Sequence, residues 1–475
     1  MGAKETKSDV LALYDISMVK TIQDSPEIAA IKSFKKSFSN NISVTLNQLI
    51  MMLNLILLGH TFFKNQINYD LLMVYQIVVF FLGLFGKIFI IGLLKYLFQD
   101  KEENDIYKLY IRMKTILVII IPIVFIPLII ISYFLIELLL RHVLKINDQN
   151  ILKEVYLNFF IFMPVIYFFE LLFLLNNQFL HHLKCYKSVF FYTLFYMMAH
   201  ASLSCILLYI LEIGIIGLTI SYGFNSFFFY YLSCKTIKIY GNYTEQNYFF
   251  YLIPYNENFD GELINTFKRN CLISIINYGD IITFLVLFAA SVFIDKKEFF
   301  INIIYINFYE LIFSINKGFY FNLKTYIMET MEDSENRQKY VASFVFYYMI
   351  MDLTIFLVLI IFRNILLNIY LMEIREYLFE LSGSVLRILF SVSLLLSSVR
   401  LILNGIVRGM SVALHPLKKI FYILCYMLLC WILCFEYNCR IFGLWISLIA
   451  FDLLLLIESI HKAYSIFPRF FHNMQ

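Results

Sequence analysis

Residues 404–416 read NGIVRGMSVALHP, and they follow about 25 residues of almost unbroken apolar sequence. Such an apolar segment is long enough to cross a bilayer as a helix, for which about 20 residues suffice. A charged side chain is costly at the centre of a bilayer, so Arg408 is expected where the helix reaches water. The Gly-x-x-Arg-Gly turn is therefore either a plain surface anchor or a motif that marks a particular fold.

The composition places the whole chain in a membrane. Of its 475 residues 61% are hydrophobic and 15% are charged, and the mean hydropathy is +0.76. A soluble globular protein needs more charge than this on its surface. Residues 1–40 are polar and lysine-bearing and have no apolar core of a signal peptide, so we expect insertion to depend on internal spans.

No cofactor chemistry is indicated. The eight cysteines form no CxxC pair and no His/Cys cluster with metal-ligand spacing, so we interpret them as small apolar residues and expect no metal. His181 and His182 are adjacent and would point about 100° apart on a helix, which suits a solvated basic surface better than a metal site. No nucleophile-base set suggests an enzyme. No phosphate-binding loop is present either, which disfavours ATP as an energy source.

Twelve apolar runs are long enough to span a bilayer, and we predict all of them to be helices because backbone polar groups must be satisfied within each span. They cover residues 41–60, 71–94, 116–140, 155–177, 189–211, 213–233, 270–293, 300–323, 341–362, 378–404, 418–438 and 441–462.

Charge in the connections predicts the orientation. Most of the 38 Lys and Arg residues lie in the terminal segments and in alternate connections. Cytoplasmic loops carry such an excess, so both termini are predicted to be cytoplasmic. Arg408 then lies at the cytoplasmic face. The protein is expected to be an integral, multi-pass protein of the plasma membrane or of an internal vacuolar-type membrane.

Two short similarities indicate an internal duplication. Residues 31–36, IKSFKK, resemble residues 264–269, INTFKR, and residues 217–221, GLTIS, resemble residues 443–447, GLWIS. The two pairs are separated by nearly the same length of chain, which pairs the first span with the seventh and the sixth with the twelfth. Recurrent lysine-rich entries and Gly-Leu runs in any polytopic protein are the alternative explanation.

A duplication predicts two six-helix halves related by a pseudo-twofold axis along the membrane normal. The predicted division comprises a cytoplasmic N-terminal segment, the N-terminal half, a cytoplasmic linker, the C-terminal half and a cytoplasmic tail. These cover residues 1–40, 41–233, 234–269, 270–462 and 463–475.

Several motifs together resemble those of the multidrug and toxin extrusion (MATE) family. Gly405, Arg408 and Gly409 match its G-V-x-R-G motif, and Gly443 with Trp445 matches its G-L-W-x-G element. The resemblance implies an all-α, twelve-helix antiporter that exchanges organic, mostly cationic solutes for protons or sodium. Residues 326–333 do not keep the family's glycine-rich segment. A non-transporting or lipid-flipping protein on a degenerate transporter scaffold is therefore the alternative.

Two carboxylates are the candidates for substrate and proton coupling. Asp280 lies near the middle of the seventh span, where the resemblance implies an acidic residue in eukaryotic members, and Glu310 lies at similar depth in the eighth. Asn277 and Asn307 are candidate polar residues of the same cavity. A structural pairing of Glu310 with Lys317 is the competing interpretation.

The N-terminal half offers Asn54 and Gln48 as polar cavity residues, although both could equally be helix-packing residues. The resemblance implies an aspartate at position 54 in bacterial members, and an asparagine cannot titrate. We therefore expect no coupling in this half. Among the other charged residues of the spans, Asp452 is expected to be structural, and Asp352 and Arg387 are a candidate ion pair.

The sequence thus predicts a secondary active transporter that alternates access between two helical halves. Its partners would be the lipid bilayer and a small organic solute, with no nucleic acid, and the protein would be a monomer without a cofactor other than the proton or sodium gradient. Aromatic side chains could attract an organic cation through their ring faces.

Overall fold

The computed structural model describes residues 25–34, scattered residues between 110 and 141, and residues 163–183, 185–213, 215–240, 279–329, 334–361, 384–410 and 416–466. Every element in these ranges is helical. After a short helix over residues 26–34, the main elements are α6 (Met163–His182), α7 (Tyr186–Cys205), η3 (Ile206–Ile210), α8 (Ile215–Tyr240), α10 (Gly279–Val292), α11 (Lys296–Glu329), α12 (Ser334–Ile361), α15 (Ser384–Gly409), α16 (Pro416–Trp431), η5 (Ile432–Glu436) and α17 (Arg440–Ile466).

These helices coincide with the predicted spans from the fourth to the twelfth. Within the described part of the chain, six helical stretches are long and apolar enough to cross a membrane. The first two predicted spans, residues 41–60 and 71–94, lie outside the described residues, and the third, 116–140, is described only at single positions. The all-helical class is thus confirmed, whereas the count of twelve stays a prediction.

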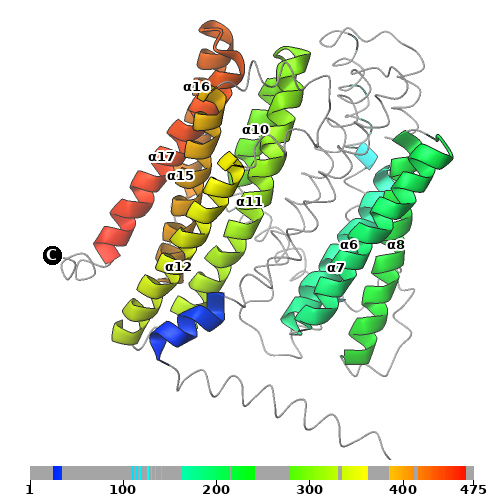
Figure 1. Ribbon diagram of the computed structural model, residues 1–475, viewed down its shortest axis with the longest axis horizontal. Coiled ribbons are helices and arrows are strands. Elements are labelled where there is room, and N and C mark those ends of the chain that lie inside the picture. The colour runs from blue at the N-terminus through cyan, green and yellow to red at the C-terminus, as the bar shows by residue number, and fades with distance from the viewer. Residues whose placement is uncertain are drawn as a thin grey trace, which may run out of the picture.

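The described helices form two bundles. Helices α6, α7 and α8 lie together on one side of the molecule, and α10 to α17 lie together on the other (Figure 1). In the first bundle α6 packs along α8 through buried side chains such as Leu172, Phe173 and Phe229. In the second, α15 packs along both α11 and α17. Each bundle therefore has its own apolar core.

Both bundles end a helical hairpin in the same way. A π-helical turn begins at Ile206 in one bundle and at Ile432 in the other. Ile206 and Ile432 are as far apart in the sequence as Gly217 and Gly443. A residue with a left-handed backbone follows each turn at that same separation, Glu212 (φ 51°) in one bundle and Asn438 (φ 52°) in the other. The backbone hydrogen bonds that close the two ends recur in the same register.

A glycine makes each hairpin tight. A Cβ atom on Gly217 would lie 3.0 Å from Leu207 Cβ, and one on Gly443 would lie 2.9 Å from the backbone carbon of Leu433. Real Cβ atoms essentially never approach another heavy atom closer than 3.0 Å, and nine in ten of their contacts are longer than 3.0–3.4 Å, so both positions suit glycine. The similarity between residues 217–221 and 443–447 thus reflects one local structure made twice.

A polar link between helices is also repeated. Asn176 of α6 donates from Nδ2 to Ser233 Oγ of α8 at 2.8 Å, and Ser459 of α17 donates from Oγ to Asn404 Oδ1 of α15 at 3.0 Å. The two serines have the same separation in the sequence as the hairpin glycines, and the two asparagines have nearly the same. These repeats support a duplicated chain, while a twofold axis along the membrane normal and the proposed domain limits stay predictions.

The short helix over residues 26–34 lies across the ends of α11 and α12 (Figure 1). Ala30 is fully buried there, and the ring centroid of Phe34 lies 4.7 Å from that of Phe319 in α11 and 5.9 Å from that of Phe344 in α12. A segment that precedes the first predicted span is therefore docked on the second bundle.

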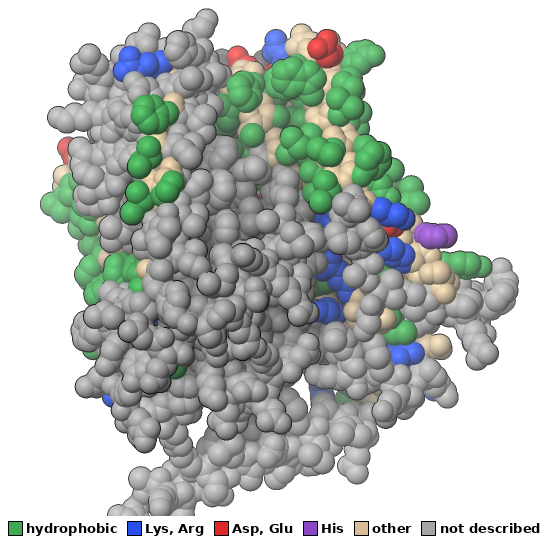
Figure 2. All heavy atoms as spheres, turned by 180° about the vertical axis from the view of Figure 1, so that it is seen from behind, with side chains coloured by type: hydrophobic (Ala, Val, Ile, Leu, Met, Phe, Trp, Pro, Cys, Tyr) green, Lys and Arg blue, Asp and Glu red, His purple; other side chains and the backbone are tan. Residues whose placement is uncertain are grey.

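The outer surface is apolar. On α16, the side chains of Phe421, Leu424, Leu428 and Trp431 share one face and are exposed. Figure 2 shows a broad hydrophobic surface on the described part of one side of the molecule, with Lys and Arg side chains gathered below it. Large exposed apolar patches are uncommon on soluble proteins, and here they suit contact with lipid.

Candidate functional site

A buried polar stripe runs along α15. Ser393, Ser397, Arg400 and Asn404 are spaced by three or four residues, which places them on one face of the helix. All four polar side chains are buried, although α15 is long and apolar enough to span a membrane. Polar groups at membrane depth face the interior of a bundle because lipid cannot satisfy them. The stripe therefore marks the inner surface of the second bundle.

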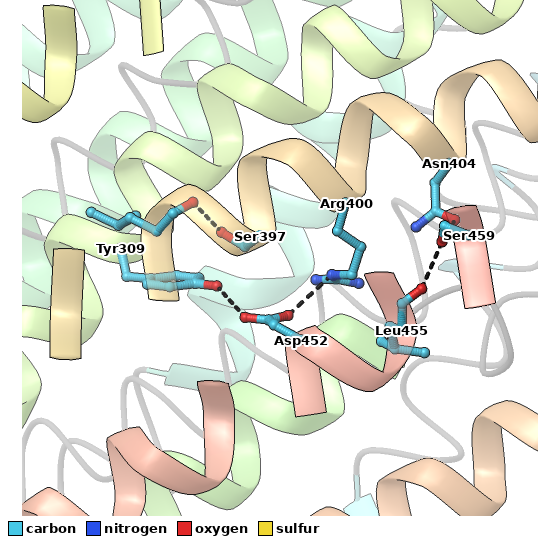
Figure 3. A network of polar contacts seen from close by, with 8 residues as sticks. Tyr309, Ser397, Arg400, Asn404, Asp452, Leu455 and Ser459 are labelled. Carbon is cyan, nitrogen blue, oxygen red and sulfur yellow. Dashed lines mark hydrogen bonds and ion pairs between the residues drawn. The ribbon is translucent and has the colours of Figure 1, made fainter. Parts of the chain in front are cut away.

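An ion pair lies at the centre of this stripe (Figure 3). Arg400 Nε is 3.0 Å from Asp452 Oδ1 of α17, and the two side chains are 4% and 1% exposed. Tyr309 of α11 donates its hydroxyl to the other carboxylate oxygen, Oδ2, at 3.3 Å. One carboxylate thus joins three helices, α11, α15 and α17, through its two oxygens.

The arrangement is sensitive to any change of charge. Removing one partner of a buried ion pair leaves an uncompensated charge, which typically costs about 3–5 kcal/mol. Protonation of Asp452 would have the same effect, because it neutralises the anion that balances Arg400. A change in the charge of either residue would therefore leave its partner as a buried, unbalanced charge.

A second polar group lies on the other side of α15. Asn316 of α11 donates from Nδ2 to Ser398 Oγ at 2.6 Å, and Tyr348 of α12 donates its hydroxyl to the backbone oxygen of Ser398 at 3.4 Å. Asp352, one turn after Tyr348, lies near Ser398 and Asn316 and is buried. Its Oδ2 atom has no hydrogen-bond partner within the described residues.

The predicted pairing of Asp352 with Arg387 is wrong. Asp352 makes no ion pair within the described part of the chain, and it lies at the level of Ser398. Arg387 precedes Ser398 by three turns of α15, which corresponds to about 16 Å along the helix axis. Arg400, further along α15, makes an ion pair with Asp452, for which a structural role was expected.

The two predicted coupling carboxylates, Asp280 and Glu310, lie on two different helices, α10 and α11. Asp280 is the second residue of α10, and its side chain lies outside the described residues. Glu310 is half-buried on α11 directly after Tyr309, so it is turned by about 100° from the residue that binds Asp452. A shared cavity for Asp280 and Glu310 stays a prediction.

The predicted polar cavity residues are mostly undescribed. Gln48, Asn54 and Asn277 lie outside the described residues, and Asn307 is half-buried on α11. Asn302, one turn and a half before Asn307, is fully buried and accepts a hydrogen bond from Trp445 Nε1 at 3.1 Å. Trp445 is itself fully buried, so this tryptophan anchors α17 to α11.

Residues 405–409 are not a turn, as the sequence had suggested, but the last helical turn of α15. A Cβ on Gly405 would lie 3.2 Å from the backbone oxygen of Tyr320, and one on Gly409 would lie 2.7 Å from Ile327 Cβ, so the two glycines bring α15 close to α11. Arg408 donates from Nη1 to the hydroxyl of Tyr320 at 3.2 Å. The motif therefore packs two helices of one bundle.

Solved structures with a similar fold include several transporters. The chain is similar to the eukaryotic MATE transporter AtDTX14, with a TM-score of 0.64, 14% identity, and coverage of 94% of this chain and 100% of the other. It is also similar to a MOP superfamily transporter from Pyrococcus furiosus, with a TM-score of 0.60, 11% identity and coverage of 94% and 98%. No protein-family model and no curated protein matches the sequence.

A third similar structure is a multidrug resistance MATE family transporter of the MOP superfamily in an outward-facing conformation, with a TM-score of 0.61, 13% identity and coverage of 95% and 98%. At these identities the likeness establishes the fold alone. The chain has the fold of MATE and MOP superfamily transporters over nearly its whole length. It is an integral, multi-pass membrane protein by its spans and its fold.

Proposed function

We propose that this protein is a secondary active transporter that exchanges an organic, cationic solute for protons or sodium. The two six-helix halves would rock about a central cavity, with both termini in the cytoplasm and the protein a monomer in the plasma membrane or a vacuolar-type membrane. The single observation that carries the proposal is the buried contact of Arg400 and Asp452, within a fold shared with transporters.

The ion pair supports ion coupling because a proton or a cation on Asp452 would remove the charge that balances Arg400. In the observed state Arg400 occupies Oδ1 and the Tyr309 hydroxyl occupies Oδ2. A proton or a solute cation that reaches Asp452 would displace Arg400, which would then need another position in the bundle. Binding is thereby coupled to a movement of α15 against α17.

Asp280, Glu310, Asn277 and Asn307 remain proposed residues of the same half, near the solute path. Asn54 and Gln48 are proposed polar contacts in the other half. A lipid-flipping function would use Arg400 as part of a basic groove, but Arg400 is already balanced by Asp452. The geometry therefore favours the transport of a cationic solute over lipid flipping.

Flux in proteoliposomes tests the proposal. An imposed pH or sodium gradient should drive accumulation of a fluorescent aromatic cation such as ethidium, and Asp452→Asn and Asp280→Asn should each abolish the driven component. Asp295→Asn, which changes an exposed carboxylate at the end of a helix hairpin, is the matched control and should keep it.

Three outcomes are distinguishable. Driven flux that persists in Asp452→Asn would remove this residue from the coupling path. Flux of a fluorescent lipid without flux of the cation would favour a flippase. A wild-type protein that is folded but moves neither would support the alternative of a non-transporting scaffold.

A further inference from the structure

A histidine is buried inside the N-terminal bundle. His200 lies in α7, within the candidate membrane span Ser188–Ile210, and it is fully buried. Its Nδ1 atom is 3.0 Å from Ser221 Oγ of α8. Ser221 Oγ also accepts a hydrogen bond from Ser204 Oγ at 3.0 Å and lies 3.2 Å from the backbone oxygen of His200. Ionisable residues at membrane depth are rare and are most often functional.

The hydrogen bonds around Ser221 define how the ring is held. A hydroxyl has one hydrogen to donate and two lone pairs that accept. If the Ser221 hydroxyl donates to the backbone oxygen of His200, its lone pairs accept from Ser204 and from the His200 ring. In that arrangement Nδ1 carries a hydrogen in both charge states, and Nε2 is the nitrogen that gains or loses a proton.

The neighbouring groups are mostly uncharged. Tyr222 of α8 contacts the histidine ring edge-on with centroids 5.5 Å apart, and Tyr196, one turn earlier on α7, stacks at 6.4 Å. Tyr196 bonds to Ser226 of α8 at 2.9 Å. Glu170 of α6 is within electrostatic range of Tyr196, and it is the one carboxylate in the sequences of α6, α7 and α8. The described groups that contact the His200 ring itself, Ser221, Tyr196 and Tyr222, are all uncharged.

The second bundle has different residues at the corresponding positions. In the register that relates Gly217 to Gly443, His200 corresponds to Tyr426, whose hydroxyl donates to the backbone oxygen of Thr283 at 3.4 Å. Conversely, Asp452 corresponds to Ser226. Each bundle thus has an ionisable group at a place where the other has a neutral one. The histidine belongs to the N-terminal bundle and the ion pair to the C-terminal bundle.

From this geometry we infer that His200 is a proton-binding site of the N-terminal half, loaded at Nε2 and held at Nδ1 by Ser221. One proton adds to neutral imidazole and gives an imidazolium, so one positive charge enters the α7 and α8 interface for each proton. The inference rests on the proposed transport function for its role, because the proton would load and unload as the halves change their exposure.

Residue-specific titration provides the first test. In ¹⁵N-histidine-labelled protein in lipid nanodiscs, the His200 signal is identified by its loss in His200→Gln. We expect a ring with Nδ1 protonated and Nε2 bare at high pH, and conversion to the doubly protonated ring as the pH is lowered. A ring that stays neutral at every pH at which the protein remains folded would overturn the inference.

Charge movement provides the second test. Proteoliposomes adsorbed on a solid-supported membrane receive a pH jump without any solute, and the displaced charge is measured. His200→Gln should lose a component of roughly one charge per protein, the charge carried by one imidazolium. The control His461→Gln, at an exposed position on α17, should lose none. Equal displaced charge in wild type and His200→Gln would overturn the inference even if His200 titrates.

The variant Ser221→Ala tests whether Ser221 positions the His200 ring or only packs α8 against α7. The Ser221 oxygen that accepts from Nδ1 favours the charged ring, so its loss should move the midpoint of the His200 titration to lower pH. An unchanged midpoint would contradict the role of Ser221. These experiments need no solute, so their failure leaves the proposed transport function intact, and an absence of ethidium flux would leave the proton site intact.

Discussion

Arg400 and Asp452 belong to helices that are separated in the sequence by α16 and η5, and their side chains meet at 3.0 Å inside the second bundle. Neither α15 nor α17 has another charged residue near this depth, because the flanking charges, Arg387, Arg408 and Glu458, are more than one helical turn away. Arg400 and Asp452 therefore join α15 to α17 at this depth, and no other charged residue of these two helices is close enough to replace either partner. Ser226, which corresponds to Asp452 in the first bundle, cannot make such a tie.

Breaking this pair should destabilise the protein strongly. Arg400→Met or Asp452→Leu alone leaves one buried charge unpaired and should lower the free energy of unfolding by about 3–5 kcal/mol. The double variant removes both charges and should recover most of that loss. Denaturant unfolding in a fixed detergent measures all three.

Stability and transport should separate in the double variant. Arg400→Met with Asp452→Leu should be folded and stable, yet it should show no gradient-driven ethidium flux. Equal destabilisation by the double variant and by the worse single variant would show that shape, and not charge balance, dominates at this site.

The hairpin glycines give a second prediction. Gly443→Ala places a methyl group 2.9 Å from the backbone carbon of Leu433, and Gly217→Ala places one 3.0 Å from Leu207 Cβ. Overpacking of this kind typically costs about 1–3 kcal/mol, and we expect the larger cost at Gly443 because backbone atoms cannot move aside easily. Thermal unfolding of the purified variants measures the difference.

Gly223→Ala is the matched control. A methyl group there would lie 2.8 Å from Ile166 Cγ1, but the atoms that it would meet all belong to the Ile166 side chain and none to the backbone. The cost should be smaller than at Gly443. If all three variants were equally stable, the close contacts at the two hairpins would not be the reason for glycine at positions 217 and 443.

Much of this architecture could be predicted from the sequence. Apolar runs of spanning length indicated the helices from α6 to α17, because a membrane helix needs a continuous apolar segment whatever its neighbours are. The repeat of Gly217 and Gly443 was visible because both glycines fill the same steric role. The helical state of residues 405–409 was missed, since two glycines one turn apart suit close helix packing as well as a turn.

The site was harder to predict than the fold. Arg400 and Asp452 are each a charge within an apolar run, but their pairing depends on how α15 is rotated against α17, and that is a property of the packed bundle. The same limit produced the wrong pairing of Asp352 with Arg387. His200 was overlooked because one histidine in an aromatic-rich span has no spacing pattern, and only its contact with Ser221 distinguishes it.

The docked helix over residues 26–34 gives a third prediction. Ala30→Glu would bury a carboxylate among Phe319, Phe344 and their neighbours, so the helix should leave the ends of α11 and α12. Cleavage by trypsin after Lys32, which is exposed, should then become faster, since a protease needs an unfolded segment. Ile28→Glu is the control, because Ile28 is 47% exposed and should tolerate the charge. Equal cleavage in both variants would contradict the docking.

Two cysteines test the predicted orientation. Cys185 precedes the candidate span Ser188–Ile210 on the side predicted to be cytoplasmic, and Cys439 lies between η5 and α17 on the opposite side. A membrane-impermeant maleimide added to intact cells that hold the protein in the plasma membrane should label Cys439 and leave Cys185 unlabelled.

After permeabilisation Cys185 should react, but slowly at neutral pH. Burial raises the pKa of the Cys185 thiol, which lowers the fraction of reactive thiolate at a given pH. Its labelling rate should therefore climb by about tenfold per pH unit while the pH stays below that raised pKa, because the thiolate fraction grows in this proportion. Cys439→Ser removes the outer site and isolates this rate. Labelling of Cys185 in intact cells, with protection of Cys439, would reverse the orientation and place both termini outside the cytoplasm.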